Sequence, residues 1–305
     1  ERLSRGRKRF HETSQRTRPP SRLRLTGLQA AAATTLCAIP FIVGFLLPAA
    51  LLLRMAVGEG DAQLGPRFVQ LVANSVTLAA LTSALLVGLA LLMAYNARLH
   101  PGLFSVNLNR VAGRGYAVPG LVIGVGTLIP LAWVDNAFDG WMRASFGIST
   151  GLLLTGGIGA LVIAYVVRFF SIGLQTVDAS LEKVRPSMED AARSLGCGPV
   201  ESLVRIHVPI MARGLATAAL LVFVEVMKEL PATLVMRPFN FDTLATQVYT
   251  LAHDERLAEA STAALAIVVA GVIPLIAISR NITRARRLAG AAPMLREPTA
   301  DAPAR

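Results

Sequence analysis

The sequence predicts an all-α membrane protein with six transmembrane helices. Hydrophobic residues make up 53% of its 305 residues and charged residues only 16%, and the mean hydropathy is +0.55. Soluble domains carry about 25% charged residues, so this chain has too few charges for an ordinary water-facing surface. Six segments reach the roughly 20 residues that a helix needs to cross a bilayer core. Because lipid offers the backbone no hydrogen bonds, each of these segments must be helical.

Five of the predicted spans contain no charged residue, and they cover residues 28–53, 68–97, 115–134, 144–167 and 260–279. The fifth span along the chain, 214–236, is apolar except for Glu225, Lys228 and Glu229. We therefore expect a basic cytoplasmic segment over 1–27, a transmembrane domain over 28–279 with its core at about 68–279, and a disordered cytoplasmic tail over 280–305.

The distribution of Lys and Arg predicts that both termini face the cytoplasm. The N-terminal segment holds nine, the loops after the second and fourth spans hold three and six, and the C-terminal segment holds six. The other three loops hold five together, so those around Asp61, Asp139 and Asp242 are expected outside. The basic residues behind the net charge of +11 lie in the terminal segments and in alternate loops. They do not form one amphipathic face, which argues against a nucleic-acid partner.

No motif for redox, metal or nucleotide chemistry is present. Cys37 and Cys197 lack CxxC spacing, and the four histidines, His11, His100, His207 and His253, are scattered over tails and loops. The chain has no GxxxxGK[ST], HExxH or GxSxG, so we expect no catalytic residue and no cofactor. Three glycines beside Pro119 in the third span favour close helix packing over a dinucleotide-binding turn, and these are Gly120, Gly124 and Gly126.

The segment 185–213, between the fourth and fifth spans, predicts a helix-turn-helix on the cytoplasmic side. Pro186 suits a first helical turn, and Ser187 with Asp190 matches a capping pattern. Gly196 can end that helix in the left-handed conformation, and Pro199 can begin a second helix that stops before Pro209. An apolar stripe on the second helix is available either to a partner or to the chain's own bundle; it consists of Val200, Leu203, Val204 and Ile206.

The spacing of this segment resembles the EAA loop of permeases of binding-protein-dependent ABC importers. The matching residues are Asp190, Ala191, Ala192, Gly196, Ile206 and Pro209. Asp190 stands where Glu is usual, and Val208 where Leu is usual. The resemblance implies a type I ABC importer permease fold, in which the loop docks as a coupling helix on an ATP-binding subunit. It further implies a bacterial cytoplasmic membrane, two ATPase subunits, a solute-binding protein and alternating access.

The charges of the fifth span need partners, because a charged side chain at membrane depth costs a few kcal/mol. Glu225 shares a helical face with Lys228 and Glu229, so one ion pair forms and one carboxylate is left over. Pro231 removes a backbone donor just after them, as in the broken helices that line cavities. Two interpretations stay open: a structural salt bridge within the bundle, or a translocation path whose Glu225 and Glu229 oxygens suit a hard cation such as Fe³⁺.

A narrower resemblance concerns the ferric iron permeases of that family. It rests on MKELPATL and RPFNFDTLAT in segment 225–255 and on VPGLVIGVG in segment 118–126. The basic segment from Arg5 to Pro19 is similar to the linker of double-length ferric permeases, and Glu1 is no initiator methionine. We therefore expect the C-terminal half of a fused permease, completed by a second half.

The segment after the fifth span is expected outside the membrane. Its polar and aromatic residues suit either contact with the binding protein or anchoring at the membrane surface, and they include Arg237, Phe239, Asn240 and Asp242. A permease for thiamine, polyamine or another small solute is the alternative within the family. A secondary transporter or channel is the alternative outside it, and would run on an ion gradient without ATP.

Overall fold

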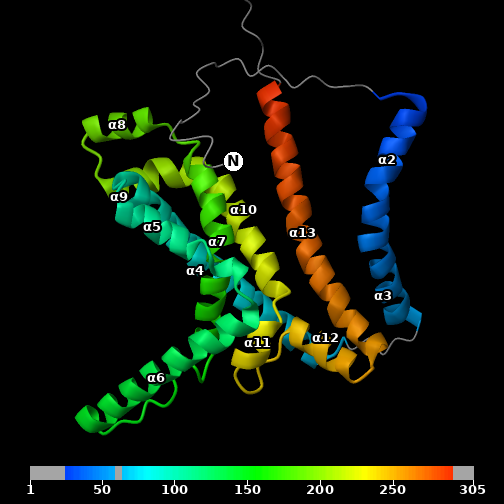
Figure 1. Ribbon diagram of the computed structural model, residues 1–305, viewed down its shortest axis with the longest axis horizontal. Helices are drawn as coiled ribbons and strands as arrows, with labels where there is room; N and C mark the ends of the chain where they lie inside the picture. The colour runs from blue at the N-terminus through cyan, green and yellow to red at the C-terminus, as the bar shows by residue number, and fades with distance from the viewer. Residues whose placement is uncertain (1–24, 59–63, 291–305) are drawn as a thin grey trace, which may run out of the picture. The chain divides into compact units, whose positions relative to one another are not determined.

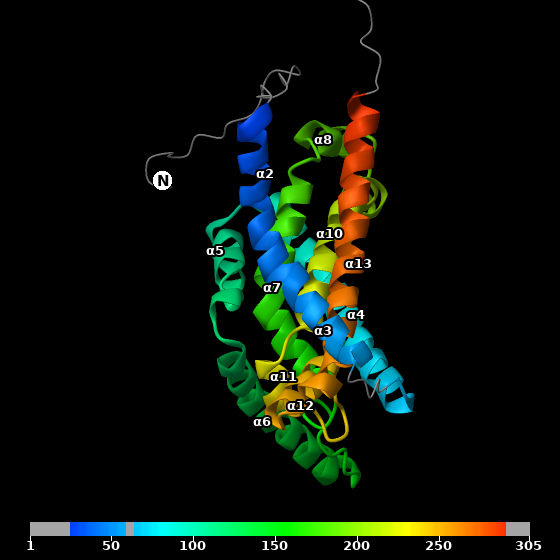
Figure 2. The ribbon, with the colours of Figure 1, turned by 90° about the vertical axis from the view of Figure 1, so that its right-hand side faces the viewer.

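The structure is a computed structural model that describes residues 25–58 and 64–290. Every regular element in these residues is a helix (Figures 1 and 2). Most of the predicted basic segment 1–27 lies outside the described residues, as do Asp61 and residues 291–305 of the predicted tail.

The long helices are α2 (Gly27–Phe41), α3 (Leu47–Gly58), α4 (Pro66–Leu99), α6 (Gly120–Phe146), α7 (Gly159–Leu181), α10 (Val208–Met227) and α13 (Leu257–Gly290). The short elements are the π-helical turns η1 (Ile42–Leu46) and η3 (Leu203–His207), the 3₁₀ turn η2 (Gly115–Ala117), and α5 (Leu103–Ala112), α8 (Pro186–Ser194), α9 (Pro199–Ser202), α11 (Pro231–Met236) and α12 (Leu244–His253).

Six helical segments among the described residues are long and apolar enough to cross a membrane. They are Gly27–Gly58, Pro66–Leu99, Gly120–Phe146, Gly159–Leu181, Pro199–Met227 and Leu257–Ile276. The predicted all-α membrane fold with six spans is therefore confirmed, although the third, fourth and fifth spans differ from their predicted bounds by more than ten residues at one end or both.

The chain divides into two units, residues 1–50 and 51–305. In the first unit, α2 and η1 bury none of their side chains, and large apolar residues such as Leu28, Leu36 and Val43 are exposed. A helix that is apolar on all sides and exposed in this way is suited to lipid and not to water.

The core of the second unit forms where α4, α7 and α10 pack against one another. Their facing side chains are buried, as Leu86, Phe169 and Val222 illustrate. Gly214 on α10 is one point of close approach, because a Cβ there would lie 1.8 Å from Oγ and 2.6 Å from Cβ of Ser180. Small residues at such positions let the backbones of membrane helices approach closely.

We expect Gly214→Ala to lower the free energy of unfolding in detergent by about 1–3 kcal/mol, the usual cost of overpacking. Ser180 cannot yield by a rotamer change alone, since its Cβ is itself too close. The added substitution Ser180→Gly should restore most of the loss. Gly88→Ala on α4 is the matched control, because no atom lies within 4 Å of its Cβ position, and it should not destabilise the protein.

The predicted bounds of the fourth span are wrong: the helix covers Gly159–Leu181 and not 144–167. α6 instead continues to Phe146, where Gly147 takes a left-handed φ of 68° and ends it. The following apolar segment is a loop, and four of its backbone N–H groups donate to acidic side chains of α6. Asp139 accepts from Thr150 and Gly151, and Asp135 accepts from Leu154 and Thr155. Asp139 thus belongs to a helix, and not to an outer loop as predicted.

The helix after Pro199 was expected to stop before Pro209, and it does not. It continues through the π-helical turn η3 into α10. The Val208 N–H donates to the carbonyl of Leu203, five residues back, and Pro209 follows directly. A π-helical turn is wider than an α-helical one, so it accommodates the proline without ending the helix. The same order occurs in the first unit, where η1 ends just before Leu47 and Pro48.

The last helix is longer than predicted. α13 begins at Leu257 and reaches Gly290, so residues 280–290 of the predicted disordered tail are helical. They carry several arginines and follow the apolar part of the helix directly.

The second unit has two distinct ends. Figures 1 and 2 show α8 and α9 at one end of α7, and α11 and α12 at the other. Tyr95 and Arg98, near the C-terminus of α4, bind the α8–α9 end. Asn74 and Ser75, in the N-terminal half of α4, bind the segment that leads into α12. The helix-turn-helix between the fourth and fifth spans and the segment after the fifth span therefore lie at opposite ends of one packed bundle.

Candidate functional site

The predicted helix-turn-helix is present as α8, a glycine turn and α9. Gly196 has a φ of 85°, and its N–H donates to the carbonyl of Arg193, while the Cys197 N–H donates to that of Ala192. This pair of bonds is the Schellman arrangement that closes helices through a left-handed glycine. The predicted cap at Ser187 is wrong, since the N-cap is Arg185 and no side chain caps the helix.

The residues of the predicted coupling loop divide between an exposed and a buried face. Asp190 and Ala191 are exposed, and Asp190 pairs with Arg193 at 3.5 Å. Ala192 is buried in the chain's own fold, Ile206 is half-buried and Pro209 is exposed. Large apolar side chains are exposed along α8, the turn and the helix that follows, namely Met188, Leu195, Val200 and Val204. Of the predicted apolar stripe, Leu203 faces inward, which leaves Val200 and Val204 available to a partner.

Glu189, the neighbour of Asp190, is the acidic residue that holds α8 to the bundle. Its Oε1 lies 2.7 Å from Arg98 Nε and 2.8 Å from His207 Nε2. His207 is fully buried, and its ring packs edge-on against Tyr95 with centroids 4.9 Å apart. The Tyr95 hydroxyl donates to the carbonyl of Pro199 at 2.9 Å. We call Tyr95, Arg98, Glu189 and His207 the coupling-loop cluster.

Arg98 also binds the end of α7. Its Nη1 and Nη2 donate to the carbonyls of Leu181 and Val184 at 2.7 and 2.5 Å. One guanidinium therefore joins the C-terminal ends of α4 and α7 to α8. In the sequence, Arg98 is one of the loop charges and His207 is one of the scattered histidines, because no local spacing links either residue to Glu189.

The predicted break in the fifth span is present. α10 ends at Met227 and α11 begins at Pro231, so the charged residues lie at a gap between two helices. Lys228 Nζ lies 2.9 Å from Glu225 Oε1, which confirms the predicted i,i+3 pair. Lys228 is 54% exposed, whereas Glu229 is buried.

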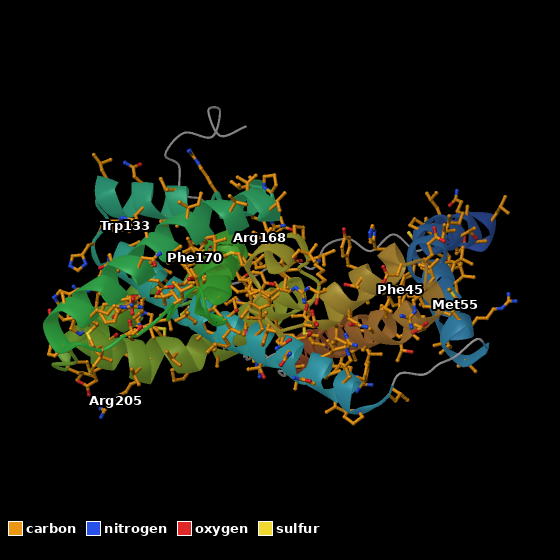
Figure 3. All side chains as sticks on the ribbon, turned by 90° about the horizontal axis from the view of Figure 1, so that it is seen from below. Phe45, Met55, Trp133, Arg168, Phe170 and Arg205 are labelled. Carbon is orange, nitrogen blue, oxygen red and sulfur yellow. The ribbon has the colours of Figure 1, made fainter. Side chains whose placement is uncertain are left out.

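The carboxylate left over in the sequence finds its partner on α7. Arg168 Nε lies 3.2 Å from Glu229 Oε2, and the Arg168 Nη1 donates to the carbonyl of Val118 at 3.2 Å. Figure 3 shows Arg168 among the packed helices, in contrast to Arg205 at the outer edge. Because the fourth span was placed too early, Arg168 was counted among the loop charges. The sequence signal that identifies it is a lone arginine within a long apolar run.

The glycines of the third span explain how this ion pair fits. A Cβ at Gly120 would lie 2.5 Å from Glu229 Oε1 and 2.6 Å from Arg168 Nη1, and one at Gly124 would contact Ala232. Close packing is thus confirmed at Gly120 and Gly124, while no atom lies within 4 Å of Gly126. Glu229 Oε1 also accepts from the Ala232 N–H at 3.3 Å, which connects α6, α7 and α11 at one point.

The predicted outer segment joins α11 to α12. Arg237 and Asp242 form an ion pair across it, Phe239 is fully exposed, and Asn240 takes a left-handed φ of 60°. Asn74 of α4 donates to the carbonyl of Asp242 at 2.9 Å. The segment is therefore a tight turn that presents one aromatic ring outward.

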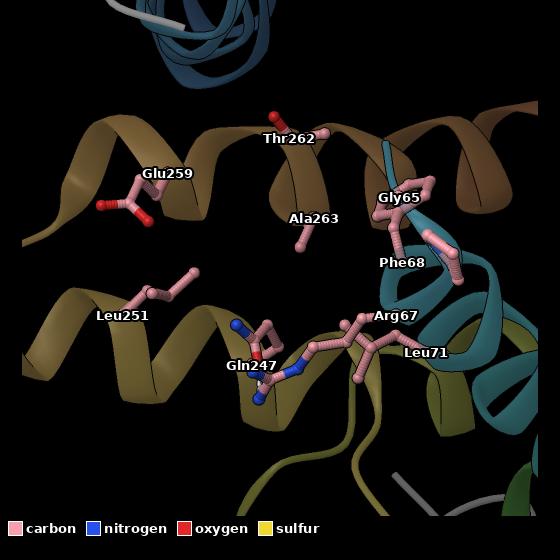
Figure 4. A pocket seen from close by; sticks show the side chains of 10 residues that line it. Gly65, Arg67, Phe68, Leu71, Gln247, Leu251, Glu259, Thr262 and Ala263 are labelled. Atoms are coloured by element: carbon pink, nitrogen blue, oxygen red, sulfur yellow. Dashed lines mark hydrogen bonds between the residues drawn. The ribbon is translucent and has the colours of Figure 1, made fainter. Parts of the chain in front are cut away.

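A cavity of about 170 Å³ lies at this same end, where α4, α12 and α13 meet (Figure 4). Leu251 on α12 and Ala263 on α13 face its interior, and Arg67 donates to Gln247 at 3.3 Å at one side. The lining is mostly apolar and contains no converging set of ligands. Within the residues that the structure describes, no group of three or more His, Cys, Asp or Glu is placed to hold a metal ion.

Relatives of this chain are permease proteins. Over 243 residues it is 27% identical to the Fe(3+)-transport system permease protein FbpB 2 of Haemophilus influenzae, an alignment that covers 79% of this chain and 45% of the relative. The chain thus spans about half the length of this relative. It is also 24% identical, over 269 residues, to the 2-aminoethylphosphonate transport system permease protein PhnV of Salmonella typhimurium, covering 83% of this chain and 95% of that one. No family model matches.

Solved structures establish the fold. A chain of a bacterial ABC transporter that imports the acidic polysaccharide alginate superposes with a TM-score of 0.61 at 15% identity, over 85% of this chain and 95% of that chain. The same type of transporter bound to a periplasmic protein with alginate pentasaccharide gives 0.57 at 13% identity, over 85% and 94%. The predicted ABC importer permease fold is confirmed, as is the predicted resemblance to ferric permeases.

Proposed function

We propose, from this fold and these relatives, that the chain is the membrane subunit of an ATP-driven importer that moves ferric iron into the cytoplasm. The observation that carries the proposal is the helix-turn-helix α8–α9, which presents Leu195 and Val200 outward at one end of the bundle. An exposed apolar surface of this kind is typical of a contact with another protein or with a membrane, and the resemblance to the EAA loop favours a protein. Here the contact is with an ATP-binding subunit, two of which serve the assembled transporter.

Transport follows from coupling between the two ends of the bundle. The ATP-binding subunits close on ATP, α8 moves with them, and the spans reorient between outward and inward access. The chain itself breaks no bond, so its contribution is a free-energy coupling between the nucleotide sites and the path. A second permease half, fused or separate, completes the path.

The proposed orientation has both termini in the cytoplasm. The excess of Lys and Arg in the alternate segments supports it. So does the arrangement of α4, whose C-terminal end binds the α8–α9 region while its N-terminal half binds the segment before α12. The turn with Arg237, Phe239, Asn240 and Asp242 then faces outward, and we propose that it contacts the substrate-binding protein.

The gap between α10 and α11 is our proposal for the translocation path, with Glu225, Lys228, Glu229 and Pro231 at its wall. Glu225, which is paired with Lys228, would meet the passing cation first, because its side chain is 22% exposed and that of Glu229 only 6%. Glu229 is held by Arg168, so its contact with a metal requires that ion pair to open. Carboxylate oxygens are the donors that a hard cation such as Fe³⁺ prefers.

Ferric iron is favoured as the substrate by the relatives named for Fe(3+) transport and by the MKELPATL and RPFNFDTLAT segments. The second candidate is a small anionic solute such as an aminoalkyl phosphonate, because the PhnV relatives align over a larger share of both chains. Selectivity in such a system lies mainly with the binding protein, so the two candidates are separated by which loaded binding protein the complex accepts.

The test is reconstitution of this chain with its ATPase and second permease half in lipid vesicles. We expect the iron-loaded binding protein to raise ATP hydrolysis several-fold over the unloaded protein, with iron appearing inside the vesicles. A phosphonate-loaded binding protein is the parallel arm. Stimulation by the phosphonate form alone would reject ferric iron, and uptake driven by an ion gradient without ATP would reject the importer class.

A further inference from the structure

His207 is a buried histidine whose two ring nitrogens both face oxygen atoms. Nδ1 lies 3.0 Å from the carbonyl oxygen of Ser202, and Nε2 lies 2.8 Å from Glu189 Oε1. The side chain has no exposed surface, so water cannot take the place of either partner. The ring is further fixed by the edge-on contact with Tyr95.

The two partners determine the protonation state of the ring. A neutral imidazole has one N–H and one bare nitrogen, whereas the protonated ring has two N–H donors. The Ser202 carbonyl can only accept, and so can an ionised Glu189. A neutral ring would therefore place a nitrogen lone pair against an oxygen lone pair in a buried site, where an unmade hydrogen bond costs most.

Protonation of Glu189 is the alternative that would satisfy a neutral ring. It is disfavoured because Arg98 Nε lies 2.7 Å from the same Oε1, and a neighbouring cation favours the ionised carboxylate. The other groups around the ring do not change this. Tyr95 points its hydroxyl to Pro199, while His100, Arg193 and Cys197 line an adjoining cavity of about 230 Å³.

We propose that His207 is a doubly protonated cation that, together with Arg98, clamps the Glu189 carboxylate and so positions helix α8. The three charges come from three elements: Arg98 from the end of α4, Glu189 from α8, and His207 from the π-helical turn at the base of α10. Glu189 is thus a positioning residue, whereas the adjacent Asp190 is exposed and pairs with Arg193 of the same helix. Any consequence for transport rests on the function proposed above. The protonation of His207 and the positioning of α8 are independent of that function.

The π-helical turn is part of this arrangement. His207 is its last residue, and Nδ1 reaches back five positions to the carbonyl of Ser202. That carbonyl belongs to the last residue of α9, so the same ring joins α9 to α8.

The protonation state is measurable by ¹⁵N NMR of labelled histidine in the complete chain. In the variant His11→Gln/His100→Gln/His253→Gln, His207 is the only histidine. Because both ring nitrogens face hydrogen-bond acceptors, we expect two protonated-nitrogen signals at about pH 7. One protonated and one bare nitrogen at that pH would overturn the proposal.

The positioning role is measurable by amide hydrogen exchange of segment 186–194 in the purified chain. Relative to wild type, His207→Gln and Glu189→Gln should each lower its protection about tenfold or more, as expected for loss of a charged hydrogen bond. His100→Gln is the matched control, since His100 is exposed beside the same cavity, and it should change nothing.

Equal protection in wild type and both variants would overturn the positioning role. If His207→Gln fails to fold, Glu189→Gln and the NMR result still decide. Neither measurement uses an ATPase. Absence of ATP-dependent uptake in the reconstituted wild type would therefore reject the proposed function alone, and a neutral His207 in a transporter that works would reject this inference alone.

Discussion

Gly196→Asp is expected to abolish ATP-dependent uptake while leaving the protein folded in the membrane. Gly196 has a φ of 85°, a backbone conformation that costs other residues about 1–2 kcal/mol. A side chain there meets no atom within 4 Å, so packing within the chain is undisturbed. The substitution instead deforms and charges the turn between α8 and α9, which is the surface proposed to dock on the ATPase. Uptake of radiolabelled ferric iron should fall at least tenfold.

Gly198→Asp is the matched control for this prediction. It places the same charge two residues away, where φ is −72° and no atom lies within 4 Å of the Cβ position. Gly198 is the N-cap of α9, a position that favours Asp. We expect uptake close to that of wild type. Equal uptake by the two variants would show that the left-handed turn has no role in coupling.

Arg168→Met is expected to cause the largest loss of stability. It leaves the Glu229 carboxylate buried without a cation, and removing one member of a buried ion pair costs about 3–5 kcal/mol. The double variant Arg168→Met/Glu229→Gln should recover most of that loss, because the glutamine oxygen can still accept from the Ala232 N–H. Unfolding of each variant in detergent measures the effect.

Lys228→Met is the control for the Arg168 prediction, since it removes the cation from the half-exposed pair with Glu225. It should lower the free energy of unfolding by less than about 1 kcal/mol.

Uptake by a variant that lacks both carboxylates separates the two roles left open for Glu225 and Glu229, a structural ion pair or a translocation path. Normal uptake kinetics in Glu225→Gln/Glu229→Gln would favour a structural pair. Slowed uptake by a stable double variant would favour the path.

Much of the fold follows from hydropathy, because a bilayer imposes a length and an apolar composition on each span. The predicted bounds of the fourth span were wrong because an apolar segment is not always helical. The segment 147–158 is apolar, but Gly147 and Gly151 are left-handed, and carboxylates of α6 accept hydrogen bonds from some of its backbone N–H groups. At Pro209 the sequence predicts the end of a helix, but the helix continues because a π-helical turn precedes the proline.

The candidate site was predictable only where its residues are close along the chain. The turn at Gly196, the pair Glu225–Lys228 and the break before Pro231 all depend on neighbours within a few positions. The partners of Glu189 and Glu229 were missed because they come from other helices. The hydropathy pattern shows that Arg98 and Arg168 are charged, but it does not show which carboxylate each of them pairs with.

By itself, the sequence determined the class of protein, its number of spans and the helix-turn-helix with its left-handed glycine, because composition and short-range spacing govern these. Only the tertiary structure decided which acidic residue of that loop binds the helix bundle and which faces outward. Glu189 and Asp190 are adjacent, but α8 turns the first toward Arg98 and His207 and the second outward. The reason is physical: a buried charge is stable only beside its counter-charge, and packing places that partner some 90 residues away along the chain.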